Sequence, residues 1–431
     1  MTSAKTPAAG KRQPRAKTSG GLSDEALLDL VQRRTIGYFW QGGHPVCGLA
    51  LDRLRRSVDA PDDRVSIGGS GFGVMAIVVA AERGWISREE ALAKLTAMVG
   101  WLERAACFHG LFPHYVNGRT GAAMSFGRKD DGSDLVESAY LFQGLLCVRQ
   151  YFDRDAAAER SLRDRITWLW RDAEWSWHTR DGRNVLTWHW SPNNGWSLDA
   201  EIRGWNECLI AYVLAAASPT FPIEPAVYHK GWAQGRDFDN RRRYYDIELP
   251  LGPDYGGPLF FSQYSFCGLD PRGLDDKYAD YWRQNVQHTL INHEHCVRNP
   301  NGHEGYGPSC WGLTASDDPA GYAAHAPDHD NGVISPTAAL SSFPYAPEPA
   351  MRALRYFHET MGAKIWGRYG FTDAFSESAN WFADTYLAID QGPIVAMIEN
   401  HRSGLLWRLF MRDPDVRRGL SRLGFRSPHL T

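Results

Sequence analysis

The sequence predicts an all-α fold, a ring of paired helices whose long aromatic loops form a cleft at one end. Apolar residues recur at helical spacing through most of the chain, which predicts about ten to twelve helices. Strand-like segments are sparse, and strands do not alternate with helices as they do in a doubly wound sheet or a TIM barrel. The connecting segments are rich in Gly, Pro, Asn and Trp, as in residues 110–121 and 188–197.

Serine residues mark two of the predicted helix starts. Ser23 precedes Asp24 and Glu25, and Ser87 precedes the Glu89–Glu90 pair. A serine followed by acids and then by apolar residues at helical spacing is typical of a helix N-terminus. The same spacing predicts further helices near residues 71–83, 134–152, 157–174, 205–217, 275–295, 334–342, 348–361 and 392–411.

Residues 1–22 are basic and contain almost nothing to bury, so we expect a disordered tail there. Residues 23–431 contain no segment with the composition of a linker, which predicts a single domain. The basic N-terminus is not followed by the apolar stretch of a signal peptide. We therefore expect a cytoplasmic protein, or a periplasmic one if a leader is missing.

The composition excludes some classes of function. With 47 Lys and Arg against 50 Asp and Glu, the charge offers no case for binding nucleic acid or an anionic membrane. The seven cysteines never form a C-x-x-C pair, which argues against a disulfide framework and a zinc ribbon. The 17 Trp, 18 Tyr and 19 Phe are numerous for this length. Packing accounts for most of them, but flat rings with polar edges also suit sugar faces.

Three short motifs are set aside. Residues 68–73 (GGSGFG) lack the rest of a phosphate-binding loop and predict a packed glycine turn at a helix start. His293 and His295 are two residues apart, so on a helix they point to different faces. Residues 328–332 begin like a calcium loop but lack its later acid. No metal and no cofactor are predicted.

Acids in aromatic surroundings near helix starts are the candidate catalytic residues, because glycoside hydrolysis usually needs two carboxyl groups. Asp134 and Glu137 are three residues apart and share a helix face, an arrangement that fits helix capping and catalysis equally well. Glu207 follows Trp205 and precedes a purely apolar helix. If burial outweighs the helix dipole there, the pKa of Glu207 is raised, as suits a general acid.

Two acids near the C-terminus have simpler interpretations. Asp390 precedes Pro393 and can cap a helix whose first turn holds that proline. Glu399 lies within a predicted helix among apolar neighbours, which indicates a buried and paired acid.

Long blocks of the chain resemble the glucoamylase-like domain of glycoside hydrolase family 144, the endo-β-1,2-glucanase family. They include SDLVESAYLFQGLL (133–146), IRGWNECLIAYVLAAASP (202–219) and YLAIDQGPIVAMIENHRSGLLW (386–407). Residues 174–196, 257–274, 310–327 and 332–347 belong to the same set. The similarity runs from about residue 24 to the C-terminus, and blocks of this length are more specific than any short motif.

The resemblance implies an (α/α)6 toroid that cleaves internal bonds of β-1,2-glucan by an inverting mechanism. It implies that Glu207 is the general acid, that Asp134 and Glu137 are acids of the cleft, and that Asp390 is a candidate for the base. Sugar contacts are implied for Phe126, Trp188, His189, Trp190, Asn193, Trp205, Gln263, Tyr264, Arg272, Trp311, His325 and Trp381. The expected partner is a β-1,2-linked glucan or gluco-oligosaccharide.

Two alternatives stay open at the level of sequence. An exo-acting hydrolase or a transglycosylase could use the same carboxyl groups on the same substrate. A toroid without catalytic activity could bind glucan only, although its acids at the expected positions argue against that hypothesis.

Overall fold

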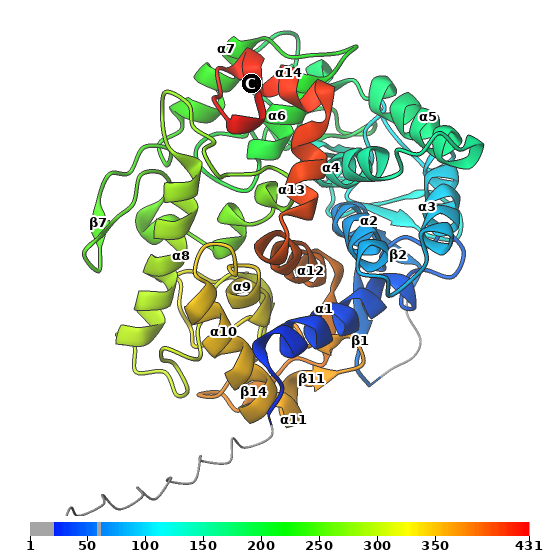
Figure 1. Cartoon of the computed structure of the whole chain (residues 1–431). Helices are drawn as coiled ribbons and strands as arrows, with labels where there is room; N and C mark the ends of the chain where they lie inside the picture. The colour runs from blue at the N-terminus through cyan, green and yellow to red at the C-terminus, as the bar shows by residue number, and fades with distance from the viewer. Residues whose placement is uncertain (1–20, 58–61, 431) are drawn as a thin grey trace, which may run out of the picture.

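The structure is a computed structural model that describes residues 21–57 and 62–430. The predicted disordered tail, residues 1–22, lies almost entirely outside the described residues. Within them the protein is all-α, as predicted, and no helix is both long enough and apolar enough to cross a membrane. The molecule is a ring of helices whose inner members lie side by side around its middle (Figure 1).

Five helices form most of the inner ring. Helix α2 packs against α4 on one side and α12 on the other. Helix α4 in turn packs against α6, and α12 packs against α9. The bounds of these helices are Ile67–Glu82 (α2), Leu135–Tyr151 (α4), Leu209–Ala217 (α6), Pro336–Leu340 (α9) and Ala388–Arg402 (α12). The apolar sequence of α6 is buried along its whole length, which explains why it shows no polar face.

Hydrogen bonds close the ring between α6 and α9, where the chain forms two short 3₁₀ turns, η4 (Leu259–Ser262) and η5 (Ser265–Cys267). The Gln263 amide donates to the carbonyl of Ala338 and to the hydroxyl of Ser342, at 2.9 and 3.0 Å. From the other side, the Ser265 hydroxyl accepts from the Ile210 N–H of α6 at 3.1 Å, and the Gln143 amide of α4 donates to the carbonyl of Tyr264, also at 3.1 Å. Polar side chains thus tie this segment to both neighbouring helices.

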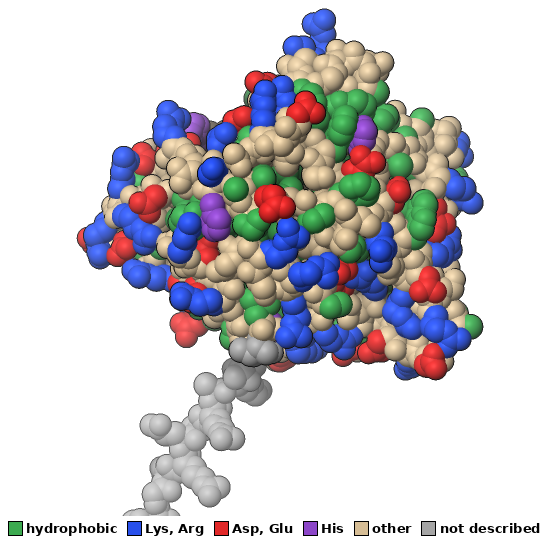
Figure 2. Space-filling view, turned by 90° about the horizontal axis from the view of Figure 1, so that it is seen from above, with side chains coloured by type: hydrophobic (Ala, Val, Ile, Leu, Met, Phe, Trp, Pro, Cys, Tyr) green, Lys and Arg blue, Asp and Glu red, His purple; other side chains and the backbone are tan. Residues whose placement is uncertain are grey.

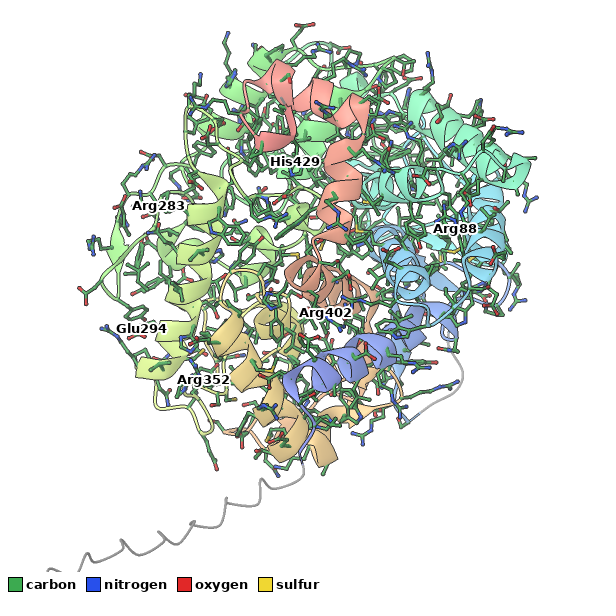
Figure 3. All side chains as sticks on the ribbon, in the orientation of Figure 1. Arg88, Arg283, Glu294, Arg352, Arg402 and His429 are labelled. Carbon is green, nitrogen blue, oxygen red and sulfur yellow. The ribbon has the colours of Figure 1, made fainter. Side chains whose placement is uncertain are left out.

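The outer helices cover the inner ones. Helix α1 packs on α2 and α12, α3 on α2 and α5, α5 on α4, α14 on α6, and α10 on α9. Their bounds are Asp24–Trp40 (α1), Arg88–Leu102 (α3), Ala157–Asp172 (α5), Pro225–Lys230 (α7), Tyr281–Arg298 (α8), Pro347–Arg355 (α10), Gly362–Ile365 (α11), Leu405–Arg412 (α13) and Pro414–Leu423 (α14). Arg402, at the end of α12, joins α12 to α1 by donating to Gln32 at 2.7 Å (Figure 3).

The helix starts at Ser23 and Ser87 are confirmed. The Ser23 hydroxyl accepts from the Ala26 N–H, and Ser87 and Glu90 exchange bonds in a complete capping box. Two other predictions are wrong. Residues 392–411 form two helices, because Gly404 adopts a φ of +68° that ends the run. Asp390 does not cap α12, whose N-cap is Leu387; Asp390 lies in the first turn instead.

Strands are short and serve to join loops. Strand β1 (Arg53–Arg55) pairs with β15 (Thr385–Leu387), β5 (Ser133–Asp134) with β6 (His189–Trp190), and β9 (Ala315–Asp318) with β10 (Gly321–Ala324), all antiparallel. The others are β2 (Arg64–Ser66), β3 (Tyr115–Asn117), β4 (Ala123–Met124), β7 (Arg243–Tyr244), β8 (Ile247–Glu248), β11 (Trp366–Gly367), β12 (Gly370–Phe371), β13 (Phe375–Ser376) and β14 (Trp381–Phe382). The pairs β1–β15, β5–β6 and β9–β10 all lie at the same end of the ring of inner helices.

Glycines allow the close crossing of α2 and α4. A Cβ atom at Gly71 would lie 2.2 Å from the Tyr140 carbonyl oxygen, and one at Gly144 would lie 2.1 Å from the Gly71 carbonyl oxygen. Any side chain at either position would therefore push the two helices apart. The glycines of residues 68–73 are explained by helix packing, as predicted from the sequence.

The charged residues of both signs are interspersed over the face shown in Figure 2.

The ion pair of Arg83 with Glu399 gives a testable prediction of stability. Glu399 is 1% exposed and accepts two bonds from the Arg83 guanidinium, at 2.8 and 3.0 Å. The predicted buried, paired acid is confirmed. We expect Arg83→Met to lower the free energy of unfolding by about 3 kcal/mol, because it leaves a buried charge short of its cation.

Urea denaturation followed by circular dichroism measures this loss. Arg160→Met, which removes an exposed guanidinium paired with Asp155 on the surface, is the matched control and should change the free energy by no more than about 0.5 kcal/mol. Equal losses in the two variants would contradict the prediction.

Candidate active site

A cavity of about 550 Å³ opens between α4, the segment before α6, and the hairpin β9–β10. Its polar wall contains Glu137, Glu207 and Asp52. The other lining residues are Arg53, Arg64, Ser66, His114, Tyr115, Phe126, Val136, Tyr140, Trp188, Phe260, Tyr264, Ala315, Tyr322, Ala324, Leu387 and Ile389. The cavity therefore combines carboxyl groups with aromatic faces, as a sugar site requires.

Asp134 is the N-cap of α4, and its carboxylate has a full set of donors. One oxygen accepts from the N–H groups of Val136 and Glu137 at 2.9 and 3.0 Å and from the Trp188 indole at 3.0 Å. The other oxygen contacts the His114 ring at 3.0 Å. Burial opposes ionisation, but the charges of His189 and His114 and these bonds lower the pKa of Asp134 to about 2. Capping thus accounts for Asp134.

Glu137 does not return a bond to the cap, as a capping box would require. Its carboxylate instead accepts from the Gly68 N–H at 2.7 Å and lies 4.0 Å from the His114 ring. Burial raises the pKa of Glu137 to about 7, with a further contribution from Asp134 and an opposing one from His114. The same two acids raise the pKa of His114 to about 9 against the effect of its own burial. Glu137 is therefore an acid of the cavity that faces a cation.

Glu207 lies just before α6, which begins at Leu209 with Cys208 as its N-cap. The Ser265 hydroxyl donates to the backbone carbonyl of Glu207. The part of Glu207 that stays exposed faces the cavity. Burial raises its pKa to about 7, and the negative charges of Asp134 and Glu137 add to the shift. The effect of burial on the pKa of Glu207 therefore outweighs that of the helix dipole. This is the requirement, inferred from the sequence, for Glu207 to act as a general acid.

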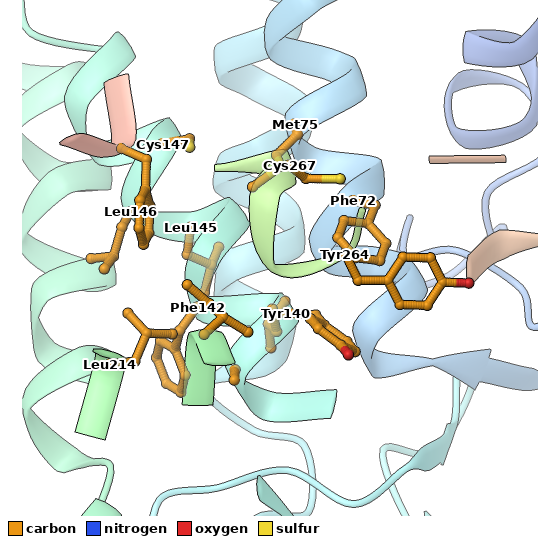
Figure 4. Close-up of a cluster of buried hydrophobic side chains, with 14 of the residues drawn as sticks. Phe72, Met75, Tyr140, Phe142, Leu145, Leu146, Cys147, Leu214, Tyr264 and Cys267 are labelled. Carbon is orange, nitrogen blue, oxygen red and sulfur yellow. The ribbon is translucent and has the colours of Figure 1, made fainter. Parts of the chain in front are cut away.

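Two aromatic rings of the cavity wall, those of Tyr140 and Tyr264, pack on a third ring, Phe72, which is buried behind them. Phe72 of α2 contacts both Tyr140 of α4 and Tyr264, with ring centroids 5.2 and 5.3 Å apart, and Tyr140 meets Tyr264 edge-on at 5.6 Å. Figure 4 shows the three rings together, beside the apolar core that holds them. The wall is rigid because its rings are packed on the inner helices.

Asp390 lies next to this wall, where it contacts Tyr264. Its side chain is buried, and one carboxyl oxygen accepts from the Tyr264 hydroxyl at 3.1 Å. Asp390 does not itself line the cavity. Its pKa is raised by burial and by neighbouring Asp373, so the protonated form is favoured.

The predicted sugar contacts separate into two groups. Trp188, Tyr264 and Phe126 line the cavity, and Phe126 with His189 also lines an adjoining cavity of about 640 Å³. Phe126 is 58% exposed and stacks on the His114 ring. His325 is buried beside Asp318 at the base of the hairpin β9–β10.

The structure does not bring the other predicted contacts into the cavity. The first three are buried by packing: Trp205 stacks on Tyr281 and Phe266, Gln263 ties η4 to α9, and Trp311 bonds to the Pro349 carbonyl. The rest lie outside the lining: Arg272 pairs with Asp270 and covers Trp407, Asn193 bonds to Asp131, Trp190 packs near His109, and Trp381 belongs to β14.

Several residues of the cavity were not predicted. His114 and Tyr115 lie in the aromatic loop 110–121, and Asp52, Arg53 and Tyr322 lie in segments without a local signal. The density of aromatic and polar residues in loop 110–121 could have indicated the first two. The others come to the cavity through strand pairings, which the sequence pattern does not reveal.

Asp130, Asp134 and His189 are the described residues that could together hold a metal ion, since one ligand atom of each lies within 4.8 Å of the others. Ion pairing also explains this group. His189 lies 3.2 Å from Asp130 and 3.6 Å from Asp134, and although burial works against it, these acids raise the pKa of His189. The absence of a metal stays a prediction.

Comparison with known proteins gives matches along the chain. A family model described as Glycoamylase, a glucoamylase family, matches residues 199–414. The endo-β-1,2-glucanase of Chitinophaga pinensis, solved with sophorotriose and glucose, is 52% identical with a TM-score of 0.93, over 95% of this chain and 100% of that one. The exo β-1,2-glucooligosaccharide sophorohydrolase of Parabacteroides distasonis is 42% identical, over 94% of this chain.

Two further facts qualify these matches. The chain spans 59% of the length of the Parabacteroides relative. The endo-β-1,2-glucanase of Talaromyces funiculosus, solved with sophorose, is only 12% identical, with a TM-score of 0.65 over 89% of this chain and 87% of that one, so it shares the fold alone.

Proposed function

Since this chain belongs to the Glycoamylase family, we propose that it is a glycoside hydrolase of family 144 that cleaves internal bonds of β-1,2-glucan. The observation that carries the proposal is the pair of carboxyl groups, Glu137 and Glu207, that opens into one aromatic cavity. The 52% identical relative is an endo-β-1,2-glucanase and the 42% identical one acts on β-1,2-glucooligosaccharides, which supports this choice.

The surroundings of the two glutamates indicate different roles. Glu207 faces the negative charges of Asp134 and Glu137, so it keeps its proton and can donate it to the leaving glycosidic oxygen. Glu137 faces the His114 imidazolium and the Gly68 N–H, which favour its ionised form. We therefore assign to Glu137 the activation of the attacking water. An inverting reaction needs about 6.5–9.5 Å between the two carboxyl groups, or a relay through a sugar hydroxyl.

His114 and Asp134 act as positioning residues in this scheme. Asp134 is held by two backbone N–H groups and the Trp188 indole, so it fixes the His114 ring beside Glu137. Phe126 stacks on that ring with a centroid distance of 4.2 Å and presents its other face toward the two cavities that it lines. Glu137, the assigned base, is thus connected through the His114 ring to Phe126, on which a sugar ring would lie.

A panel of glucans of defined linkage tests the proposal. We expect new reducing ends from β-1,2-glucan and none from β-1,3-, β-1,4- or α-1,4-glucans, and the first product should be the α-anomer when followed by proton NMR, because inversion reverses the β-configuration. Binding of β-1,2-glucan without new reducing ends would favour a catalytically inactive toroid instead. Activity confined to another linkage would refute the assigned substrate.

Exo action is the second candidate, because the 42% identical relative is an exo-acting sophorohydrolase. The distribution of products at early times separates the two. Endo action gives a spread of chain lengths, exo action gives one small product, and transglycosylation gives products longer than the substrate.

The pH dependence of kcat/KM follows from the two raised pKa values. Glu137 must lose its proton and Glu207 must keep its own, and burial raises the pKa of each to about 7. We expect a narrow bell whose rising limb reports the ionisation of Glu137 and whose falling limb reports the loss of the Glu207 proton. Initial rates on a β-1,2-gluco-oligosaccharide measure it. A profile that stays flat from about pH 5 to about pH 9 would contradict both assignments.

A further inference from the structure

Two buried carboxyl groups outside the proposed reaction contact each other directly. Asp373, in the turn before β13, and Asp390, in the first turn of α12, are 2% and 1% exposed, and the carboxyl group of each is a direct neighbour of the other. Among the described residues, no donor bonds to Oδ1 of Asp373 or to Oδ2 of Asp390, and both oxygens are buried. Ionised carboxylates only accept hydrogen bonds, so this contact requires a proton between the two groups.

The remaining oxygens of the pair are held from both sides. Oδ2 of Asp373 accepts from the Asp317 N–H at 2.7 Å, and Oδ1 of Asp390 accepts from the Tyr264 hydroxyl at 3.1 Å. The nearby cation, Arg53, is bound to Asp317, with its Nη1 2.6 Å from each carboxylate oxygen. The Thr385 hydroxyl also donates to Asp317.

The charged and titratable groups that face the pair are Asp317 on β9, Arg53 on β1, Tyr38 on α1, Tyr264 between η4 and η5, and Tyr322 on β10. Arg53 is matched by Asp317, so in the part of the chain that the structure describes no unpaired cation neutralises the pair itself. Two carboxyl groups in contact in such a place cannot both ionise without strong repulsion.

The pair connects to the cavity through two different elements. Asp390 holds Tyr264, whose ring belongs to the aromatic wall, and Asp373 holds the backbone of β9 at Asp317. Strand β9 pairs with β10, which places Tyr322 in the lining of the cavity. Separation of the two carboxyl groups would therefore move the aromatic wall and the hairpin β9–β10 apart.

We propose that Asp373 is a positioning residue that shares one proton with Asp390, and that this pair fixes Tyr264 and the hairpin β9–β10 on opposite sides of the sugar cavity. The kinetic part of this inference rests on the proposed function. The proton shared by the pair can be tested without any substrate.

The kinetic experiment compares Asp373→Ala, Asp373→Asn and the control Asp384→Asn on a β-1,2-gluco-oligosaccharide. The alanine variant leaves Asp390 without its partner, and we expect KM to rise about tenfold while kcat changes less than about threefold, as for a loss of binding geometry. The asparagine amide can still donate to Asp390 and accept from the Asp317 N–H, so Asp373→Asn should return KM to within about threefold of the native value. Asp384, which bonds to Ser57 at the surface, should be neutral when replaced.

The second experiment measures thermal unfolding of the native chain and Asp373→Asn from about pH 5 to about pH 8. Burial and Asp373 raise the folded-state pKa of Asp390 above its unfolded value, so the folded chain holds a proton that the unfolded chain releases. The stability from this proton is present at low pH and is lost as pH rises toward the folded pKa. The difference in Tm, native minus variant, should therefore fall as pH rises.

Parallel pH dependences of Tm in the two proteins would overturn the shared proton. Native KM values in Asp373→Ala would overturn the positioning role, as would an asparagine variant as impaired as the alanine variant. If the chain cleaves no β-1,2-glucan, the proposed function fails, and the unfolding experiment still decides whether the carboxyl pair holds a proton.

Discussion

Replacement of Glu207 by Gln is expected to lower kcat on β-1,2-glucan by about 100- to 10,000-fold, the range for loss of a general acid. The amide keeps the size of the side chain but has no proton to give to the leaving sugar oxygen. The loss should be much smaller on an aryl β-sophoroside whose phenol leaves without protonation. Reducing-end and phenol-release assays measure the two rates.

Glu201→Gln is the matched control for this experiment. Glu201 lies six residues earlier and pairs with Arg203 away from the cavity, so its amide should leave kcat unchanged. Equal turnover by the native enzyme and Glu207→Gln would remove Glu207 from the mechanism. An equal loss on the natural and the activated substrate would show that Glu207 does not act on the leaving group.

Glu137→Gln is expected to cause a loss of similar size, about 100- to 10,000-fold in kcat, but with the opposite substrate dependence. If Glu137 activates water, a better leaving group cannot replace it, so the aryl β-sophoroside should be hydrolysed as poorly as the glucan. The amide also loses the attraction of the His114 imidazolium, which lies 4.0 Å from the native carboxylate.

The control for Glu137→Gln is Glu294→Gln on α8, where the native side chain pairs with Arg298 on the surface. Thermal unfolding of both variants separates loss of chemistry from loss of fold. Recovery of Glu137→Gln on the activated substrate would transfer the role of proton donor to Glu137. If this variant kept the native kcat, the activation of water would have to be assigned to Asp134 or Asp390 instead of Glu137.

Local features were readable from the sequence because their causes are local. The caps at Ser23 and Ser87 depend on neighbours within one helical turn. The apolar neighbours of Glu399 indicated its burial, but its partner Arg83 lies 316 positions away. The raised pKa of Glu207 follows from its place before an apolar helix, and burial indeed dominates there. The all-α class follows from helical spacing in most segments.

The end of α12 and the role of Asp390 were decided by tertiary structure. Periodicity runs on through Ser403, and only the left-handed backbone of Gly404 separates α12 from α13. Asp390 has the spacing of a cap, but the pairing of β15 with β1 starts α12 earlier and turns this carboxyl toward Asp373.

The sequence by itself therefore determined the class of fold, because helical spacing is a local pattern, and it indicated the candidate acids, because they stand near predicted helix starts. Only the tertiary structure decided which acids share a cavity and what charge each one carries. The bond from the Gly68 N–H to Glu137 and that from Tyr264 to Asp390 join residues 69 and 126 positions apart. Adjoining residues can indicate that a group is buried, but the charges of distant residues also set its pKa, and the local sequence does not reveal those charges.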